Sequence, residues 1–406
     1  MDIKVTHKSN VVKGEIKLTS SKSISNRVLI IQALCADGFE IENLAAAEDT
    51  QVLQRLLASN ESILDVGLAG TTMRFLTAYL SLKEGVTVLT GAKRMKERPI
   101  KVLVEALGQL GADISYEENI GYPPLKISGG KLDKDELTIG AGVSSQYISA
   151  LLLIAPKLEN GLKLTLAGDL ISKPYIDMTI AIMQYFGAEV KWNKNTIEVK
   201  PGFYIAKDFI VEADWSAASY WYGIAALATE ADITLYGLQR DSLQGDAAVV
   251  DIYKNFGVET IFIDGGIRLL KPSNFKCQTP AINYNFSNCP DIAQTVAVTC
   301  AALNIEAHFT GLITLRIKET DRIEALHIEL TKLGFKLDVD GDKLNVKSHG
   351  VLCSNQAVKT YHDHRMAMAF APLALLAEIA IEDKQVVEKS YPSFWEDLQV
   401  VGFDML

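Results

Sequence analysis

Two hydrophobic patterns alternate along this chain. Apolar residues at helical spacing are followed by short stretches in which apolar and polar residues alternate, which predicts amphipathic helices followed by half-buried strands. A glycine separates the two patterns in five segments: Leu110-Gly111-Ala112, Phe186-Gly187-Ala188, Phe256-Gly257-Val258, Leu333-Gly334-Phe335 and Val401-Gly402-Phe403. These glycines are 68 to 77 residues apart. We expect each to end a helix in a left-handed cap and to lead into a strand.

This spacing indicates an internal repeat. Short strands such as VTVLTG and LKLTLAG end about 20 residues before a glycine, and strands such as PLKISGG and TIEVKPG follow it. One unit is therefore roughly strand, helix, strand, strand, and 406 residues hold about six units, the first of them an eroded copy at Leu56-Leu57-Ala58. The pattern predicts an α/β fold, and the length favours two domains.

Six other segments predict helices of a different kind. They are SSKSISNRVLIIQAL (20–34), AGTTMRFLTAYL (69–80), SSQYISALLLIAP (144–156), DWSAASYWYGIAAL (214–227), PDIAQTVAVTCAAL (290–303) and DHRMAMAFAPLALL (363–376). Small or polar residues at each start are expected to cap the first turn, and the apolar remainder predicts burial on most sides. Free N–H groups at such helix starts bind anions. Capping alone explains any one segment, but six of them favour a shared anion site.

Composition excludes several classes of function. Hydrophobic residues make up 48% and charged residues 22%, as in globular proteins, and the net charge of -10 argues against nucleic acid binding. No apolar run reaches the length of a membrane span, and MDIKVTHKSN has no secretory signal. The five cysteines are scattered, so neither disulfides nor zinc are expected. We expect a cytoplasmic monomer with no metal, cofactor, membrane or nucleic acid partner.

Basic residues gather at three places in this acidic chain, Lys93–Arg98, Lys318–Arg322 and His364-Arg365. Arginine suits bidentate contacts with carboxylate or phosphate, and lysine supplies a point charge. A solvated surface is the alternative for any one of these runs. Gathered in a cleft, they would concentrate an anionic substrate.

Eleven motifs, in order, are SKSISNR, AGTTMR, KRMKERPI, SSQ, SKPYID, SAASYW, LQGD, PDIAQT, RIKETDR, DHRMAMAF and EKSYPSF. From about Lys13 to Leu398 the chain therefore resembles the 5-enolpyruvylshikimate-3-phosphate synthases, and MKERPI, KETDR and DHRMAM together make the resemblance specific. It implies a shikimate-pathway transferase of aromatic amino acid biosynthesis. Such an enzyme joins phosphoenolpyruvate to the 5-hydroxyl of shikimate 3-phosphate by addition and elimination in an interdomain cleft, and releases phosphate.

The resemblance also implies the enolpyruvyl transferase fold, an inside-out α/β barrel type. Each of two domains has three repeated βαβαββ-like units with buried parallel helices. One domain is expected at 20–212 with the shikimate 3-phosphate contacts. The other, 1–19 plus 213–406, is expected to carry phosphoenolpyruvate contacts and the catalytic carboxylates.

Matching motifs assign the substrate-binding residues. On the shikimate 3-phosphate side the resemblance implies Ser23, Arg27, Ser144, Ser145, Gln146, Ser172 and Tyr175. Around phosphoenolpyruvate it implies Gly70, Arg98, Arg322, Arg365 and Lys389. Lys22 is expected to touch both ligands, and Asp291 and Lys318 to reach the shikimate hydroxyls.

The reaction requires a proton at C3 of phosphoenolpyruvate and a base at the attacking hydroxyl. Asp291 is the predicted base, with helix capping as its alternative role. Glu319 is the predicted acid–base group at C3, with Lys22 as competitor. His364 either assists or is structural.

Three sites depart from the commoner family pattern: Thr19-Ser20 replaces Pro-Gly, Leu68 replaces an Asn, and Thr314 replaces an Asn or a similar residue. The sequence leaves two alternative functions. A UDP-N-acetylglucosamine enolpyruvyl transferase shares the fold, but residues 93–101 contain no cysteine of the kind that family carries in this loop. A non-catalytic repeat protein that binds phosphorylated ligands has no need for Asp291 and Glu319 beside so many cations.

Overall fold

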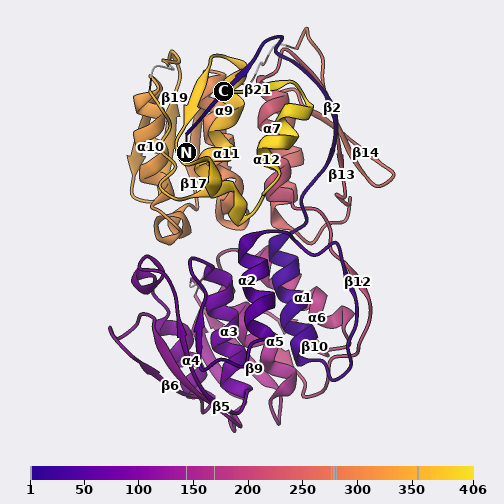
Figure 1. The fold of residues 1–406 in the computed structure, drawn as a ribbon, viewed down its shortest axis with the longest axis vertical. Coiled ribbons are helices and arrows are strands. Elements are labelled where there is room, and N and C mark those ends of the chain that lie inside the picture. Colours follow the sequence, from indigo (N-terminus) through magenta and orange to yellow (C-terminus); the bar gives the residue numbers. More distant parts are fainter. Residues whose placement is uncertain are drawn as a thin grey trace. The chain divides into compact units, whose positions relative to one another are not determined.

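The computed structural model describes residues 2–142, 144–168, 170–275, 277, 279, 281–353 and 356–406. Contacts divide the chain into two compact units, each with its own hydrophobic core (Figure 1). Unit 1 comprises Met1–Ser20 and Glu212–Leu406, and unit 2 comprises Ser21–Val211. Unit 2 is therefore an insertion in unit 1, and the chain passes between them twice. Among the described residues, no helix is long and apolar enough to span a membrane.

Unit 2 contains two four-stranded sheets of one topology. The first has the order β4-β5-β7-β6, from β4 (Ile63–Asp65), β5 (Gly85–Thr90), β7 (Leu125–Gly129) and β6 (Asp113–Tyr116). The second has the order β10-β11-β9-β8, from β10 (Val190–Asn193), β11 (Thr196–Val199), β9 (Leu162–Ala167) and β8 (Glu136–Gly140). In each sheet the first two strands in chain order are parallel and the other pairs are antiparallel. A short parallel pair, β3 (Ile41–Glu42) and β12 (Phe209–Ile210), accompanies them.

Unit 1 repeats this topology. One sheet has the order β14-β15-β13-β2, from β14 (Glu259–Ile263), β15 (Gly266–Lys271), β13 (Glu230–Tyr236) and β2 (Val11–Lys17). Another has the order β16-β17-β19-β18, from β16 (Ala281–Asn285), β17 (Glu306–Thr310), β19 (Lys343–Lys347) and β18 (Lys336–Asp340). In a third sheet, β1 (Ile3–His7) lies between β20 (Ile379–Ile381) and β21 (Phe403–Met405). The predicted βαβαββ repeat is confirmed.

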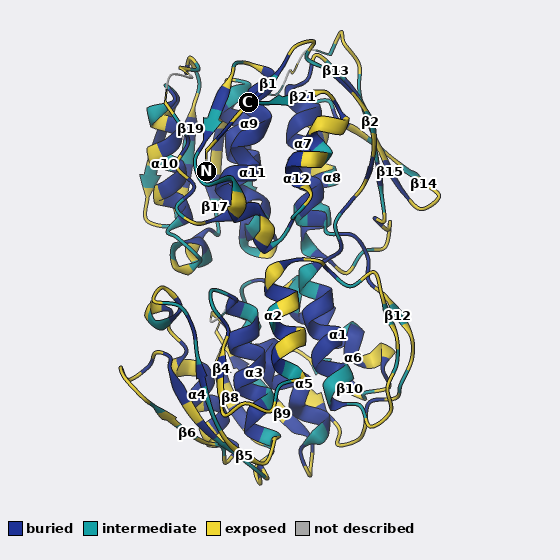
Figure 2. Ribbon diagram, viewed as in Figure 1, coloured by how far each residue is buried: buried dark blue, intermediate teal, exposed yellow. Residues whose placement is uncertain are grey.

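The most deeply buried helices lie inside each unit. Unit 2 has α1 (Lys22–Leu34), α3 (Gly70–Leu82) and α5 (Ser145–Ile154), and unit 1 has α7 (Trp215–Leu227), α9 (Ala293–Ala302) and α11 (His364–Phe370). They pack on one another, and Figure 2 shows them buried around most of their circumference. Because no face is left for solvent, their sequences carry no polar stripe. The predicted buried helices are therefore confirmed.

A second set of helices carries the glycine caps. These are α2 (Glu48–Leu57), α4 (Lys101–Gln109), α6 (Lys173–Tyr185), α8 (Val249–Lys254), α10 (Arg322–Lys332) and α12 (Phe394–Val400). The five repeat glycines behind α4, α6, α8, α10 and α12 all have positive φ, between 80 and 103°. At the eroded copy, Ala58 remains right-handed, since a side chain disfavours the left-handed cap.

The expected caps of the buried helices are only partly present. Ser21, Ser144, Asp214 and Asp363 accept hydrogen bonds from the first turns of α1, α5, α7 and α11. The cap position of α3 is Ala69 and that of α9 is Ile292, and neither has a side-chain cap. For these two helices the capping expectation was wrong.

A buried carboxylate, Glu212, anchors the chain where it passes from unit 2 back into unit 1. Glu212 accepts hydrogen bonds from Trp215 Nε1 at 2.8 Å, Gln239 N at 2.9 Å, Ser242 Oγ at 2.7 Å and Gln244 Nε2 at 3.0 Å. Burial raises its pKa, but the four donors compensate in part for lost hydration. This arrangement fixes the chain immediately before α7.

Candidate active site

The starts of α9 and α10 bring opposite charges together in unit 1. Asp291 lies in the 3₁₀ turn Pro290–Ile292 ahead of α9. Arg322, the first residue of α10, donates from Nη1 to Asp291 Oδ1 at 3.0 Å and from Nη2 to Glu319 Oε2 at 2.8 Å. Lys318 Nζ is 3.5 Å from Asp291 Oδ1. The structure therefore joins four residues that the sequence predicted for the site.

The start of α11 completes this cluster. The carboxylate of Asp363 accepts from the backbone N–H of Arg365 at 2.9 Å and from Arg322 Nε at 2.7 Å. Arg365 Nη2 is 3.2 Å from Asp291 Oδ2, and Arg365 Nη1 donates to the Asp291 carbonyl at 3.0 Å. Within the described part of unit 1, three cations here face three carboxylates: Lys318, Arg322 and Arg365 against Asp291, Glu319 and Asp363. We call these six residues the carboxylate cluster.

Burial and neighbouring charges act in opposite directions on the pKa of Asp291. Burial raises it, but Arg365, Lys318 and Arg322 outweigh burial and hold the pKa below its ordinary value. Burial lowers the pKa of Lys318, because an ammonium loses hydration there. While the three cations contact it, Asp291 is therefore ionised but only weakly basic.

Two further residues lie beside the carboxylate cluster. The buried Lys389 donates from Nζ to the carbonyl of His362 at 3.0 Å. His364 is almost completely buried, with Nδ1 3.9 Å from a carboxylate oxygen of Asp363. This burial favours the structural interpretation of His364 over direct proton transfer to a ligand.

In unit 2, Gly70 and Arg98 lie against each other. A Cβ added at Gly70, the first residue of α3, would lie 2.5 Å from Arg98 Nη1 and 2.8 Å from Arg74 Nη1. Arg98 is buried, its Nε has no hydrogen-bond partner, and within the described residues it forms no ion pair. A buried cation without counter-charge is unfavourable, and a bound anion relieves that cost. We call Gly70, Arg74 and Arg98 the arginine corner.

Helix α5 holds this corner in place. Gln146 Nε2 donates to Thr71 Oγ1 at 3.0 Å, which ties α5 to the first turn of α3. The hydroxyl of Tyr147 donates to the carbonyl of Pro99 at 2.5 Å. These bonds fix the main chain next to Arg98 and bring the predicted residue Gln146 to the arginine corner.

Arg27 is buried in α1 and connects three helices. It donates to Thr179 Oγ1 and the Ser23 carbonyl, both at 2.7 Å, to Ser149 Oγ at 3.1 Å and to the Tyr175 carbonyl at 3.3 Å. These partners are hydroxyl and carbonyl oxygens, and burial lowers the pKa of Arg27 to about 10. Arg27 therefore stabilises the packing of α1, α5 and α6, whatever contact it makes with a ligand.

The other predicted residues of unit 2 lie at helix starts. Lys22 Nζ is 3.0 Å from Asp49 Oδ2, and both side chains are largely buried. Ser144 caps α5, and Ser145 is its buried first residue. Ser172 precedes α6 with φ of 58°, a left-handed conformation that is uncommon for a residue with a side chain. Such strain often accompanies functional sites.

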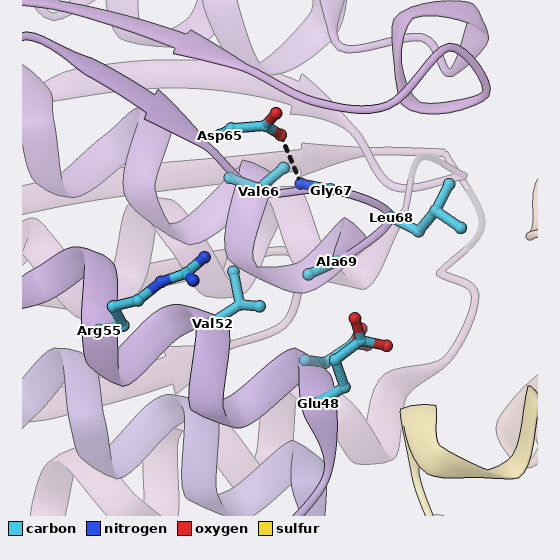
Figure 3. A pocket seen from close by; sticks show the side chains of 9 residues that line it. Glu48, Val52, Arg55, Asp65, Val66, Gly67, Leu68 and Ala69 are labelled. Atoms are coloured by element: carbon cyan, nitrogen blue, oxygen red, sulfur yellow. Dashed lines mark hydrogen bonds between the residues drawn. The ribbon is translucent and has the colours of Figure 1, made fainter. Parts of the chain in front are cut away.

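A cavity of about 280 Å³ adjoins the start of α3. Figure 3 shows Glu48 and Arg55 of α2 on one side, and Asp65 at the end of β4 and Leu68 of the β4–α3 connection on the other. Asp65 Oδ1 accepts a hydrogen bond from Gly67 N at 2.8 Å. Asp49 also lines it. Three carboxylates and one guanidinium give the described lining a net negative charge. This cavity is therefore a poor site for an anion, in contrast to the neighbouring arginine corner.

The departures from the family pattern have local consequences. The Thr19 carbonyl accepts from Asp214 N at 2.8 Å, and Ser20 pairs with Ala213, so this segment ties the two crossings together. Leu68 is half-buried at the rim of the acidic cavity. Thr314 Oγ1 is buried without a hydrogen-bond partner among the described residues.

Several residues of these clusters escaped the sequence prediction. Asp363 and Arg74 lie inside the quoted motifs DHRMAMAF and AGTTMR, where only a neighbouring residue was assigned a role. Asp49 belongs to no recognised motif, and only its contact with Lys22 reveals it. Side-chain pairing between distant segments was the missing information.

The fold alone defines a class of protein. The chain superimposes on a solved structure of EPSP synthase from Acinetobacter baumannii with a TM-score of 0.81 and 22% sequence identity, covering 100% of this chain and 99% of that one. At this identity the comparison establishes the two-unit α/β fold.

Sequence comparison is more specific. The family model described as EPSP synthase (3-phosphoshikimate 1-carboxyvinyltransferase) matches residues 6–59 and 51–398. A 3-phosphoshikimate 1-carboxyvinyltransferase from Bacteroides fragilis is 49% identical over 397 residues, 97% of this chain and 96% of that protein. One from Sulfurovum sp. is 36% identical over 421 residues, 96% and 97% of the two chains. The chain belongs to the EPSP synthase family.

Proposed function

We propose that this chain transfers the enolpyruvyl group of phosphoenolpyruvate to the 5-hydroxyl of shikimate 3-phosphate and releases phosphate. Family membership supports the reaction. Arg98 is the observation that carries the proposal for the site, because a buried guanidinium without a carboxylate partner among the described residues matches an anionic ligand. The carboxylate cluster supports the proton transfers.

The chemistry has two balanced stages. In the first, the 5-hydroxyl oxygen bonds to C2 of phosphoenolpyruvate, loses its proton to a base, and C3 gains a proton to become a methyl group. In the second, the methyl group loses a proton, the C2–O bond to phosphate breaks, and the enol ether and inorganic phosphate are formed. The enzyme must therefore place one base at the hydroxyl and one acid–base group at C3.

We assign the base to Asp291 and the acid–base group at C3 to Glu319, with Lys22 as the alternative donor. The cations that contact Asp291 hold its pKa low, which makes it a poor base as long as they remain. An anionic ligand that binds Arg365 or Lys318 draws positive charge away from Asp291. Binding therefore raises the pKa of Asp291 toward the range in which it accepts the hydroxyl proton. Because the cations then contact the ligand and less closely Asp291, ligand binding is coupled to activation of the base.

The substrate-binding residues divide by chemistry. Gly70, Arg98, Arg322, Arg365 and Lys389 are assigned to phosphoenolpyruvate. Ser23, Arg27, Ser144, Ser145, Gln146, Ser172 and Tyr175 are assigned to shikimate 3-phosphate, with Asp291 and Lys318 at its hydroxyls and Lys22 at both ligands. Fixed donors that surround developing negative charge supply the larger share of catalysis in such sites.

The decisive experiment supplies the purified protein with shikimate 3-phosphate and phosphoenolpyruvate in deuterium oxide. We expect phosphate release at one equivalent per enol ether, with deuterium in the vinyl group of the product or in recovered phosphoenolpyruvate, because C3 passes through a methyl group. Phosphate release without deuterium contradicts the addition–elimination route. Turnover with UDP-N-acetylglucosamine instead, or binding without phosphate release, would support one of the two alternative functions.

A further inference from the structure

A buried acid next to the carboxylate cluster has no role in the mechanism above. Asp246 lies in the 3₁₀ turn Gly245–Ala248, its side chain is buried, and Oδ1 has no hydrogen-bond partner within the described chain. Its Oδ2 accepts a hydrogen bond from Ser216 Oγ. The segment belongs to the motif LQGD, whose aspartate received no function from the sequence.

Ser216 connects this acid to Arg365. Arg365 Nη2 donates to Ser216 Oγ at 3.3 Å, and the same nitrogen is 3.2 Å from Asp291 Oδ2. The guanidinium therefore lies between two acids, one in direct contact and one through a single hydroxyl. Any change in the charge of Asp246 alters the field at Arg365 over a short, partly buried path.

The charged and titratable groups that face Asp246 come from several elements. They are Asp291 of the turn before α9, Arg365 of α11, Asp214 at the cap of α7, and Cys289 and Tyr284 near the end of β16. Burial first, and then Asp291, raise the pKa of Asp246 to about 7, whereas Arg365 and the Ser216 hydrogen bond act in the opposite direction. The missing partner at Oδ1 is consistent with this balance, since a neutral carboxyl tolerates burial better than a carboxylate.

We propose that Asp246 is a positioning residue for the anion-binding function of Arg365, and that it takes up a proton when Arg365 binds its anionic ligand. This inference rests on the proposed function for the identity of that ligand, phosphoenolpyruvate. A bound anion neutralises Arg365 and removes the charge that stabilises ionised Asp246. Proton uptake then avoids a buried, uncompensated carboxylate beside Asp291.

The consequence is a pH-dependent affinity. As the pH falls below about 7, Asp246 becomes neutral, and Arg365 offers its full charge to the ligand. As the pH rises above about 7, Asp246 ionises, so the ligand must either bind to a partly neutralised Arg365 or bind together with a proton. Binding and protonation are reciprocally linked, and a pKa change of one unit on binding corresponds to about tenfold in affinity.

Asp246→Asn tests this directly, because asparagine resembles the neutral acid and cannot ionise. We expect the ratio of KM for phosphoenolpyruvate, wild type over variant, to rise by up to about tenfold between pH 6 and pH 9. Titration of the ligand itself cancels in this ratio. The matched control is Asp251→Asn on α8, an exposed acid paired with Lys254, for which the ratio should stay constant. A constant ratio for Asp246→Asn overturns the proposal.

A second measurement does not depend on catalysis. The pKa of Asp246 is higher in the folded protein than in the unfolded chain. The free energy of unfolding therefore falls as the pH rises from about 4 to about 7, where Asp246 is ionised only in the unfolded chain, and it stays at the lower value above about pH 7. Asp246→Asn escapes this loss. We expect its Tm to exceed that of the wild type by several degrees at pH 8.5, with a much smaller gain at pH 5. An equal difference at the two pH values means that Asp246 does not titrate there, and the proposal fails.

Ser216→Ala provides an independent variant if Asp246→Asn does not fold. It removes the hydroxyl between Arg365 and Asp246, so the ratio of KM for phosphoenolpyruvate, wild type over variant, should again rise between pH 6 and pH 9. A constant ratio shows that the hydroxyl does not couple Asp246 to Arg365 and contradicts the proposal. Absence of turnover in the wild type, by contrast, would reject the proposed function and leave the Tm comparison to decide the role of Asp246.

Discussion

The arginine corner of unit 2 and the carboxylate cluster of unit 1 contain the same kind of side chain in opposite electrostatic situations. In the described residues Arg98 forms no ion pair, whereas Arg322 contacts Asp291, Glu319 and Asp363 at once. Both guanidinium groups are buried. A buried cation that lacks counter-charge favours an external anion, while one that contacts three carboxylates also holds those carboxylates in place, whether or not it binds a ligand. Burial of an arginine therefore does not by itself distinguish binding from positioning.

The largest expected effect tests the carboxylate cluster. Asp291→Asn keeps the shape of the side chain but removes its charge and its capacity to accept the hydroxyl proton. We expect single-turnover rates to fall on the order of 10²- to 10⁴-fold, with a smaller change in ligand affinity. Rapid-quench kinetics separate the two quantities. An unchanged single-turnover rate would remove Asp291 from the proposed base position.

Substitution of Arg98 in the arginine corner should weaken the interaction with the anionic ligand. Arg98→Ala is expected to lower kcat/KM on the order of 10²- to 10³-fold, as for the loss of one fixed donor at developing charge. Arg94→Ala is the control, because Arg94 lies in the same loop but is exposed and paired with Glu97. Similar activities for the two variants would place Arg98 outside the site.

Substitutions in the carboxylate cluster should lower the stability of the fold, whereas loss of Arg98 should not. Removing one partner of a buried ion pair leaves an uncompensated charge, so Asp363→Asn should lower the free energy of unfolding by about 3–5 kcal/mol. Arg98→Met removes a cation that has no internal partner and should leave the stability unchanged or slightly higher. Urea denaturation of both variants measures the difference. Equal losses would show that the two arginines are not in different electrostatic situations.

The smallest expected change concerns one methyl group. Gly70→Ala places a Cβ within 2.5 Å of Arg98 Nη1, so the guanidinium must shift. We expect KM for phosphoenolpyruvate to rise about tenfold, in line with the 1–3 kcal/mol that overpacking costs, while the fold is retained. Steady-state kinetics at fixed shikimate 3-phosphate give the value, and a KM equal to that of the wild type would contradict the close packing at Gly70.

The sequence predicted the repeat and the buried helices well, because both depend on local pattern. Gly111 and its equivalents mark left-handed caps that few other residues adopt, and their spacing survives divergence of the rest. The caps of α3 and α9 were predicted wrongly for an instructive reason. A polar residue at a helix start serves either the helix or another group, and Asp291 lies in a separate turn where it contacts cations.

The local sequence pattern could not predict which charged residues pair with one another. Asp49, Asp246 and Asp363 are brought to their partners by folding, across 27 residues from Lys22, 30 from Ser216 and 41 from Arg322. No spacing rule connects such positions. The resemblance to the family located the basic residues, but the counter-charges that distinguish the two regions required coordinates.

The insertion of unit 2 within unit 1 also orders events during synthesis. All of Ser21–Val211 leaves the ribosome while most of unit 1 is still untranslated, so unit 2 has every residue of its core early. Strand β1 must wait for β20 and β21, its partners at the opposite end of the chain. Unit 2, which contains the arginine corner, is therefore free to fold first, and unit 1, which contains the carboxylate cluster, is completed only with its last strand.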